Sequence, residues 1–187
     1  MNSKAFRMPK PVKIIGRSSS ITNAFVNGII PCISPSDDEI KTALNLLEQD
    51  ENDVRCVYCG DKMTEWDHLN PLIVDQRPTG YISEIKNLVP SCGKCNQSKG
   101  NKYWKDWINS KAKLSPKTRG ILDISKRIEL IERYEHNNKP LELNFEEIVG
   151  KELWEQHWNN HKMLILKMVE VQEISNQIKE KIEKGYK

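Results

Sequence analysis

The sequence lacks a long apolar run, and this excludes a protein with membrane-spanning helices. The longest candidate, residues 163–166, ends at Lys167, whereas a spanning helix needs about 18 consecutive apolar residues. The first residues, Met1 to Lys4, lack the apolar segment of a secretory signal peptide. We therefore expect a protein without a membrane partner, located in the cytoplasm. Repeats of the length found in solenoid proteins are also absent.

Apolar side chains are scarce overall. They make up 37% of the 187 residues, against about 45–50% in an ordinary globular domain. The length is that of one domain, or of a small domain with helical additions. A small core with short strands needs another source of stability, such as a bound metal ion.

Positive charge is unevenly distributed along the chain. The net charge is only +3, yet residues 1–19 carry five basic and no acidic side chains, and residues 94–119 carry seven lysines, one arginine and one aspartate. Such clusters are typical of proteins that bind a polyanion, although a solvated helix face gives the same pattern. Because residues 1–19 have few large apolar side chains, we expect a flexible basic arm there.

Apolar spacing and capping signals predict a mostly helical chain with a few short strands in the middle. A capping box at Ser36 and Glu39 marks the start of one helix, and Ser115-Pro116 marks the start of another. The helices are expected at residues 20–30, 37–49, 93–99, 103–108, 116–136 and 151–184. Short β-type segments are expected at residues 54–58, 63–68 and 88–89. The fold class is therefore α+β.

The last predicted helix carries a heptad-like apolar seam. Its members follow alternating spacings of four and three residues: Leu164, Met168, Val171, Ser175, Ile178 and Ile182. Such a seam packs against another helix. The partner is either this protein's own core or a second copy of the chain.

Four of the five cysteines form two C-x-x-C pairs, Cys56 with Cys59 and Cys92 with Cys95. Two such pairs can complete a closed tetrahedral Cys₄ site, which zinc prefers and which leaves no position for a catalytic water. Two disulfides, an iron–sulfur cluster or a redox pair are the alternatives. The double pair favours a structural Zn²⁺ ion. The fifth cysteine, Cys32, is expected to be a small buried side chain.

The segment between the cysteine pairs carries a more specific pattern. Asp67-His68 ends a predicted strand, Asn87-Leu88 precedes a second short strand, and Asn96 directly follows the last cysteine. Over residues 54–100 this arrangement resembles the HNH endonuclease superfamily, also called ββα-metal nucleases, including the zinc-binding pairs that many members carry. Its third motif residue is asparagine, which makes it an H-N-N variant. The resemblance implies a zinc-stabilised ββα-metal core.

The resemblance implies a role for each motif residue. His68 would activate the attacking water as a general base, a role that suits a side chain with an ordinary pKa of about 6.5. Asp67 and Asn96 would bind a catalytic divalent ion, Mg²⁺ or Mn²⁺, because both ions prefer oxygen ligands. Asn87 would hold the loop and orient the histidine.

The adjacency of Asp67 and His68 raises a geometric question, because neighbours in a regular strand point to opposite faces. Both can serve one site if the strand ends or bulges there, or if metal and water lie on different sides of the attacked phosphate. Glu65 shares a face with Asp67 in a regular strand, where an accessory metal ligand is one interpretation; we expect instead that Glu65 lies at the surface or supports a metal ligand.

Together these features predict a metal-dependent endonuclease acting on double-stranded DNA, most simply a type II restriction enzyme working as a homodimer. A monomeric nicking or homing-type enzyme, a non-catalytic zinc-dependent DNA-binding module, and an RNA substrate remain open. Lys94, Lys99 and Lys102 are expected to contact phosphate. The predicted division is an arm with two helices at residues 1–53, the nuclease core at residues 54–113, and a helical region at residues 114–187.

Overall fold

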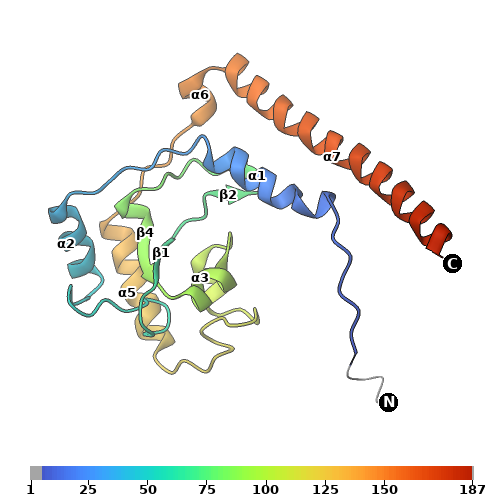
Figure 1. Ribbon diagram of the computed structural model, residues 1–187. Coiled ribbons are helices and arrows are strands. Elements are labelled where there is room, and N and C mark those ends of the chain that lie inside the picture. The colour runs from blue at the N-terminus through green and yellow to red at the C-terminus, as the bar shows by residue number, and fades with distance from the viewer. Residues whose placement is uncertain (1–5, 187) are drawn as a thin grey trace. The chain divides into compact units, whose positions relative to one another are not determined.

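The computed structural model describes residues 6–186, which form two compact units. One unit spans Val26–Phe145, and the other combines residues 6–25 with residues 146–186 (Figure 1). Helices make up 51% of the described residues and the strands are short, so the predicted α+β class is confirmed. Among the described residues, no helix combines the length and apolar character needed to cross a membrane. Lys4 of the predicted basic arm lies outside the described residues.

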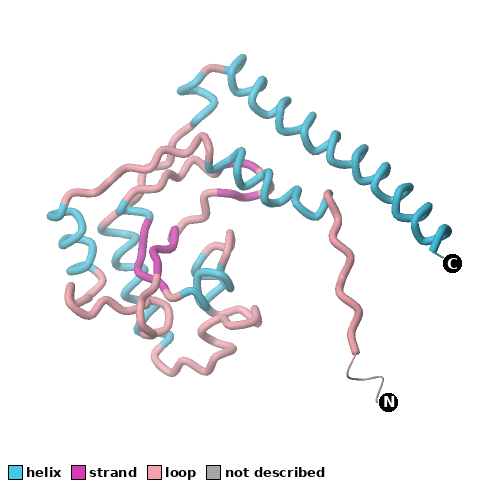
Figure 2. The backbone as a smooth tube through the Cα atoms, in the orientation of Figure 1, coloured by secondary structure: helices cyan, strands magenta, loops and turns pink. Residues whose placement is uncertain are grey.

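A strand pair followed by a helix forms the centre of the larger unit. Strand β1 (Glu65–His68) pairs antiparallel with β4 (Leu88–Ser91). Helix α3 (Gly93–Lys99) begins two residues after β4 ends and lies beside the strand pair in Figure 1. A second, two-residue pair joins β2 (Ile73–Val74) to β3 (Arg77–Pro78). Figure 2 shows that loops make up most of the chain around these strands.

Two further helices pack on each other in the larger unit. Helix α2 (Asp37–Leu46) starts with the predicted capping box, in which Ser36 Oγ accepts a hydrogen bond from the Glu39 amide and Glu39 Oε2 accepts one from the Ser36 amide. It packs against α5 (Ile124–Asn137). Tyr134 of α5 is fully buried, and its hydroxyl donates to the carbonyl of Ile85, which holds α5 against the approach to β4.

The core of the larger unit is built around aromatic side chains and the four paired cysteines. Trp104 and Trp107, both from α4 (Trp104–Ile108), are fully buried. The ring of Tyr58 meets that of Trp107 edge to face at a centroid distance of 5.1 Å, a favourable aromatic geometry. The cysteine-rich turns are therefore part of the core rather than a surface addition.

Residues 54–58 do not form the predicted strand. The described backbone has one isolated bridge there, between Arg55 and Lys62. The chain turns sharply instead: the Cys56 amide donates to the carbonyl of Asp61, and the Gly60 amide donates to the carbonyl of Cys56. The two-cysteine turn uses the backbone groups that a strand would have offered to a neighbour.

The helix predicted from residue 116 begins only at Ile124. Ser115 caps a turn as expected, with its Oγ accepting from the Thr118 amide at 3.3 Å. That turn ends at Gly120, whose φ of +69° is incompatible with a continuing right-handed helix. The capping signal was therefore present, but it starts a single turn and not α5.

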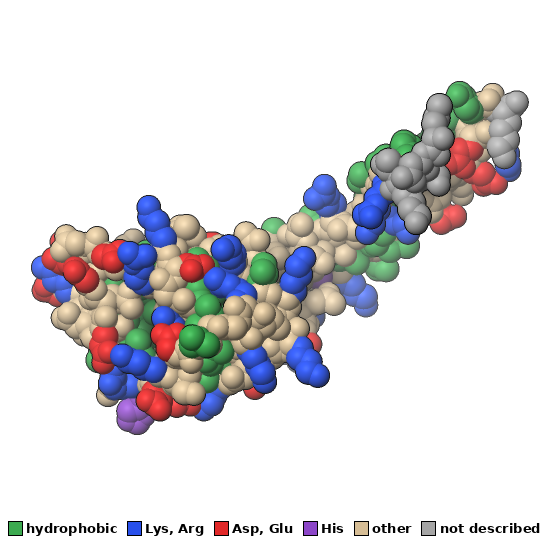
Figure 3. Space-filling view, turned by 90° about the horizontal axis from the view of Figure 1, so that it is seen from below, with side chains coloured by type: hydrophobic (Ala, Val, Ile, Leu, Met, Phe, Trp, Pro, Cys, Tyr) green, Lys and Arg blue, Asp and Glu red, His purple; other side chains and the backbone are tan. Residues whose placement is uncertain are grey.

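The smaller unit pairs α7 (Lys151–Tyr186) with the segment before Phe25. The Ile14 amide donates to Gln172 Oε1, Thr22 Oγ1 lies 2.9 Å from His161 Nε2, and the ring of Phe25 contacts His157. Residue numbers rise along one partner and fall along the other, so the segments run antiparallel. Of the heptad-like seam, Met168 is buried, whereas Leu164, Ile178 and Ile182 are exposed. Figure 3 shows apolar side chains gathered on this unit.

Candidate metal centre and nuclease site

The four paired cysteines converge in the larger unit. Cys56 and Cys59 lie on the sharp turn, Cys92 immediately precedes α3, and Cys95 lies within it. All four are buried, and their Sγ atoms lie within 4.8 Å of one another. The Sγ atoms of Cys59 and Cys92 are 3.6 Å apart. No disulfide joins them, since a disulfide needs an S–S distance of about 2.05 Å.

This arrangement fits a tetrahedral zinc ion. With Zn–S bonds of about 2.3 Å, the sulfurs at the corners of a tetrahedron lie about 3.8 Å apart, close to the observed spacing. The cysteine thiols also perturb one another. Hydrogen bonding to Cys59 raises the pKa of Cys56 to about 12, and hydrogen bonds from Cys56 and Cys95 lower that of Cys59. A divalent cation would allow all four to be thiolates.

An arginine from a later segment completes the surroundings of the cysteines. Arg119 Nη1 donates to Cys95 Sγ at 3.4 Å, and its Nη2 donates to Asp61 Oδ2 at 2.6 Å. The side chain is only 15% exposed. Its charge offsets the negative charge of a Cys₄ site.

The fifth cysteine, Cys32, is exposed. The expectation of a buried side chain was wrong, because Cys32 lies on an extended segment bridged to Ser83.

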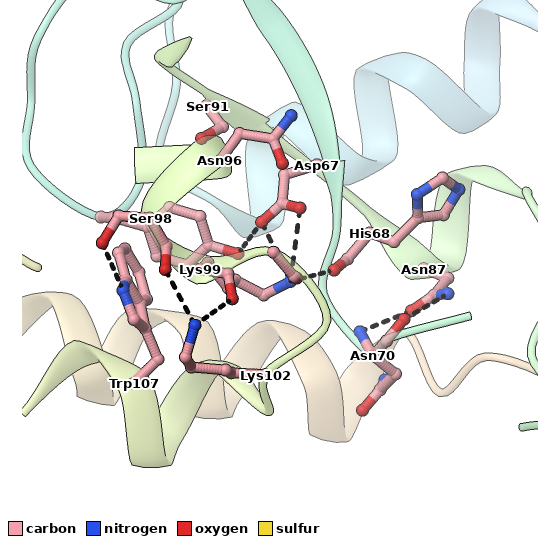
Figure 4. Close-up of polar contacts among 12 residues, drawn as sticks. Asp67, His68, Asn70, Asn87, Ser91, Asn96, Ser98, Lys99, Lys102 and Trp107 are labelled. Atoms are coloured by element: carbon pink, nitrogen blue, oxygen red, sulfur yellow. Dashed lines mark hydrogen bonds and ion pairs between the residues drawn. The ribbon is translucent and has the colours of Figure 1, made fainter. Parts of the chain in front are cut away.

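Asp67 and His68 lie in a regular strand and face opposite sides of it. Asp67 is opposite Val89 and His68 is opposite Leu88 in the β1–β4 ladder, so no bulge brings the two side chains together. Figure 4 shows the carboxylate of Asp67 pointing toward Lys99 and the ring of His68 pointing away from it. The strand ends at His68, as the sequence analysis considered, but it has no bulge before that residue.

Asp67 is a buried carboxylate with a full set of partners. Its side chain is 5% exposed. Tyr58 donates its hydroxyl hydrogen to Oδ2 at 2.8 Å, and Lys99 Nζ lies 3.3 Å from both carboxylate oxygens. Burial raises the pKa of Asp67, while Lys99 and Tyr58 act in the opposite direction. The amino group of Lys99 thus lies directly against the Asp67 carboxylate in this pocket.

Lys99 was expected to contact phosphate, and the structure gives its ammonium other partners. The side chain is 1% exposed. Besides Asp67, Nζ donates to the carbonyl oxygens of His68 at 2.7 Å and of Gly100 at 3.4 Å. The other two lysines lie at the surface: Lys94 is 3.8 Å from Asp61 and Lys102 bonds to the carbonyl of Ser98. Of the three lysines predicted to contact phosphate, Lys94 and Lys102 are exposed and Lys99 is buried.

The imidazole of His68 is held on the other face of β1. His68 Nε2 lies 2.8 Å from Ser83 Oγ. Burial, together with repulsion from the Lys99 ammonium, lowers the pKa of His68 to about 4. The ring is therefore neutral near pH 7, which is the state in which it can accept a proton.

Asn87 is fully buried and ties down the loop after β1. Its Oδ1 accepts from the Asn70 amide at 2.9 Å, and its Nδ2 donates to the Asn70 carbonyl at 3.1 Å.

Asn96 reaches from α3 to the other face of the strand. Its Nδ2 donates to Glu65 Oε2 at 2.7 Å, and Glu65 shares a strand face with Asp67. Three oxygen-bearing side chains thus approach one face of β1.

The comparison with protein families agrees with this geometry. Residues 56–102 match the family model of the HNH endonucleases. The chain carries an HNH endonuclease domain. The matched segment begins at the first paired cysteine and ends at Lys102, so it contains both cysteine pairs and all four predicted motif residues. Searches of curated proteins and of solved structures gave no match.

Three residues of the HNH domain and its surroundings were not identified from the sequence: Tyr58, Ser83 and Arg119. Tyr58 lies between two cysteines, where a hydroxyl carries no motif signal. Ser83 and Arg119 reach their partners from 15 and 24 residues away. Because these contacts depend on how loops fold back on the core, no local spacing indicates them.

Proposed function

We propose that the HNH domain hydrolyses DNA phosphodiester bonds, with His68 as the general base. The observation that carries this proposal is the neutral imidazole at the end of β1, held by Ser83 and beside a loop tied by Asn87. A general base must be unprotonated at the working pH, so that one of its atoms can accept a proton. Asn87 acts on the loop that follows His68, and so it positions the base without touching the substrate.

Asp67 and Asn96 are the residues we propose to bind the catalytic Mg²⁺ or Mn²⁺. A carboxylate and an amide carbonyl are oxygen donors of the type that these ions prefer. When bound, the ion supplies positive charge to the scissile phosphate and the leaving oxygen. The pocket around Asp67 already accommodates a cation, the ammonium of Lys99. Glu65 holds the Asn96 amide in place.

The substrate we propose is double-stranded DNA. Lys94 lies in the first turn of α3 and Lys102 follows the end of that helix, and both offer exposed cations for phosphate contacts. Figure 3 shows lysine and arginine side chains spread over the viewed face of the larger unit, with acidic side chains between them. Spaced cations of this kind suit a backbone with regularly spaced phosphates. The specific role we propose is that of a type II restriction enzyme.

The test is cleavage of plasmid and phage DNA with Mg²⁺ or Mn²⁺, followed by sequencing of the fragment ends. His68→Ala is compared with His136→Ala, which removes an exposed histidine of the same unit. Loss of a general base typically lowers the rate by 10²–10⁴-fold. We expect this loss for His68→Ala only, with discrete fragments from the wild type. Equal activity of the two variants would refute the assignment of His68.

The same assay separates the alternative functions. Nicks in one strand favour a monomeric nicking or homing-type enzyme. Discrete double-strand cuts together with a two-chain complex on DNA in sedimentation favour a homodimeric restriction enzyme, because one site cuts one strand. Zinc-dependent binding of DNA without cleavage favours a non-catalytic module, and cleavage of RNA alone would replace the substrate. Each result except the discrete double-strand cut overturns the restriction role.

A further inference from the structure

The ammonium of Lys99 occupies a pocket that has the character of a cation site. Its three hydrogen-bond acceptors are the carboxylate of Asp67 and the carbonyl oxygens of His68 and Gly100, at 2.7–3.4 Å. An ammonium has three donors, so the pocket satisfies it fully. Carboxylate and carbonyl oxygens are also the donors that divalent cations take in proteins.

Two cations cannot share this pocket at close range. Two positive charges a few ångströms apart repel strongly in a buried site, where water screens them little, and a divalent ion doubles the repulsion of a single charge. Both oxygens of Asp67 already face Lys99, and Oδ2 also accepts from Tyr58. A metal ion at Asp67 therefore requires the ammonium to leave.

The end of α3 leaves space next to Lys99. Lys99 is the last residue of α3, and the next residue, Gly100, has a φ of +52° with open space where a side chain would lie. The lysine side chain has four rotatable bonds, so its head can swing without unwinding the helix. The surface nearby carries Lys102, in a region that we propose to meet phosphate.

We propose that Lys99 is the resident counter-cation of Asp67 and that a divalent ion binds Asp67 by replacing this ammonium. This inference rests on the proposed function, since it assigns Asp67 to the metal. The replacement lowers the apparent affinity for the ion by the fraction of molecules in which the pair is open. It also frees a cation at the active site only when the metal is present. Lys99 would then contact phosphate in the metal-bound enzyme, which reconciles its burial here with the expectation from the sequence.

The test measures Mn²⁺ binding to the full zinc-loaded chain by electron paramagnetic resonance of free Mn²⁺, without DNA. Lys99→Met removes the competing ammonium and should tighten Mn²⁺ binding by at least about tenfold, equivalent to 1.4 kcal/mol. Lys102→Met removes the same charge from the next turn and controls for general electrostatics, with an expected change below about twofold. Equal or weaker binding by Lys99→Met than by Lys102→Met would overturn the proposal.

A third variant separates this proposal from the one on which it rests. Asp67→Asn should abolish Mn²⁺ binding. If it binds Mn²⁺ as the wild type does, the assignment of Asp67 to the metal is refuted, and the replacement of Lys99 with it. If binding is lost in Asp67→Asn but unchanged in Lys99→Met, only the replacement fails.

A measurement on the wild type covers the case in which Lys99→Met does not fold because it leaves Asp67 buried without its counter-charge. Lysines are acetylated with an N-hydroxysuccinimide ester, with and without Mg²⁺, and the modified sites are quantified by mass spectrometry. Acetylation of Lys99 should rise at least about fivefold with Mg²⁺, since a buried amine is protected and a released one reacts. Lys102 should react equally in both conditions. Continued protection of Lys99 at saturating Mg²⁺ would overturn the proposal.

Discussion

The polar side chains around the end of β1 are each held by a residue from another part of the chain. His68 is held by Ser83, Asp67 by Tyr58 and Lys99, and Asn96 by Glu65. A side chain whose rotamer is fixed by such a bond loses less entropy when it takes part in the reaction. The orientation of His68 should therefore depend on Ser83, although Ser83 belongs to no recognised motif.

Removing the hydroxyl of Ser83 tests that dependence. We expect Ser83→Ala to lower kcat/KM by about five- to tenfold, because one hydrogen bond contributes about 1 kcal/mol. Zinc content should not change. The matched control is Ser34→Ala, which alters an exposed serine of the same unit. If both variants cleave DNA at the same rate, Ser83 does not position the base.

At the scale of elements, the turn that carries Cys56 and Cys59 is joined to helix α5 by an arginine. Arg127 Nη1 donates to the carbonyl oxygens of Val57 at 3.2 Å and Cys56 at 3.4 Å. Gly60 allows this approach: a Cβ at this position would lie 2.7 Å from Arg127 Nη2, and the φ of Gly60 is +76°. The glycine is thus required both by backbone conformation and by the neighbouring guanidinium.

Comparing two glycines separates these requirements. Gly120 also has a positive φ, +69°, but open space around its Cβ position. We expect Gly120→Ala to lower the unfolding free energy by about 1–2 kcal/mol through backbone strain alone. Gly60→Ala should cost about 1 kcal/mol more, because Arg127 must move and lose its hydrogen bonds to the turn. Urea denaturation measures both, and equal losses would contradict a structural role for the Arg127 contact.

At the scale of the whole molecule, the stability of the larger unit depends on the cysteine cluster. The four sulfurs lie within the hydrophobic core, next to Tyr58, Trp104 and Trp107. Structural zinc contributes an apparent binding free energy of about 10–16 kcal/mol in small zinc-binding domains, which is as large as the total stability of an ordinary domain, about 5–15 kcal/mol. Loss of the metal should therefore affect the whole unit and not only the two turns.

We expect Cys95→Ser to lose stoichiometric zinc and the cooperative thermal unfolding transition of the Val26–Phe145 unit. DNA cleavage should be lost with it. Cys32→Ser is the control, because it makes the same substitution at an exposed cysteine outside the cluster. Metal analysis and calorimetry measure the two effects. An unchanged transition in Cys95→Ser would show that the core is stable without the metal.

The two compact units are defined by which residues pack together, whereas the three segments predicted from the sequence were divided by their expected roles. The division into residues 1–53, 54–113 and 114–187 stays a prediction about which parts support catalysis. The structure adds that residues 14–25 pack with α7, although more than 130 residues separate His157 from the carbonyl of Phe25 that it contacts. The apolar periodicity of either segment does not indicate that the other is its packing partner.

The sequence by itself indicated most of the helices, the cysteine site and the HNH domain. The spacing of Cys56, Cys59, Cys92 and Cys95 indicated a metal site, and the capping box at Ser36 indicated the start of α2, because both signals act over two to four residues. The order of Asp67, His68, Asn87 and Asn96 indicated the HNH domain. Spacing signals of this kind depend only on neighbouring residues, so they can be recognised without knowing the tertiary structure.

Only the tertiary structure decided which partner each of these groups has. It brings together residues that are far apart in the sequence: Lys99 contacts Asp67, 32 residues away, Ser83 contacts His68, 15 residues away, and Arg119 contacts Cys95, 24 residues away. It also decided that β1 stays regular through His68, so that the two adjacent motif side chains face opposite ways. The physical reason is that burial and charge neutralisation depend on which distant segments come together, and the energy of a buried charge is set by those neighbours and not by its position in the chain.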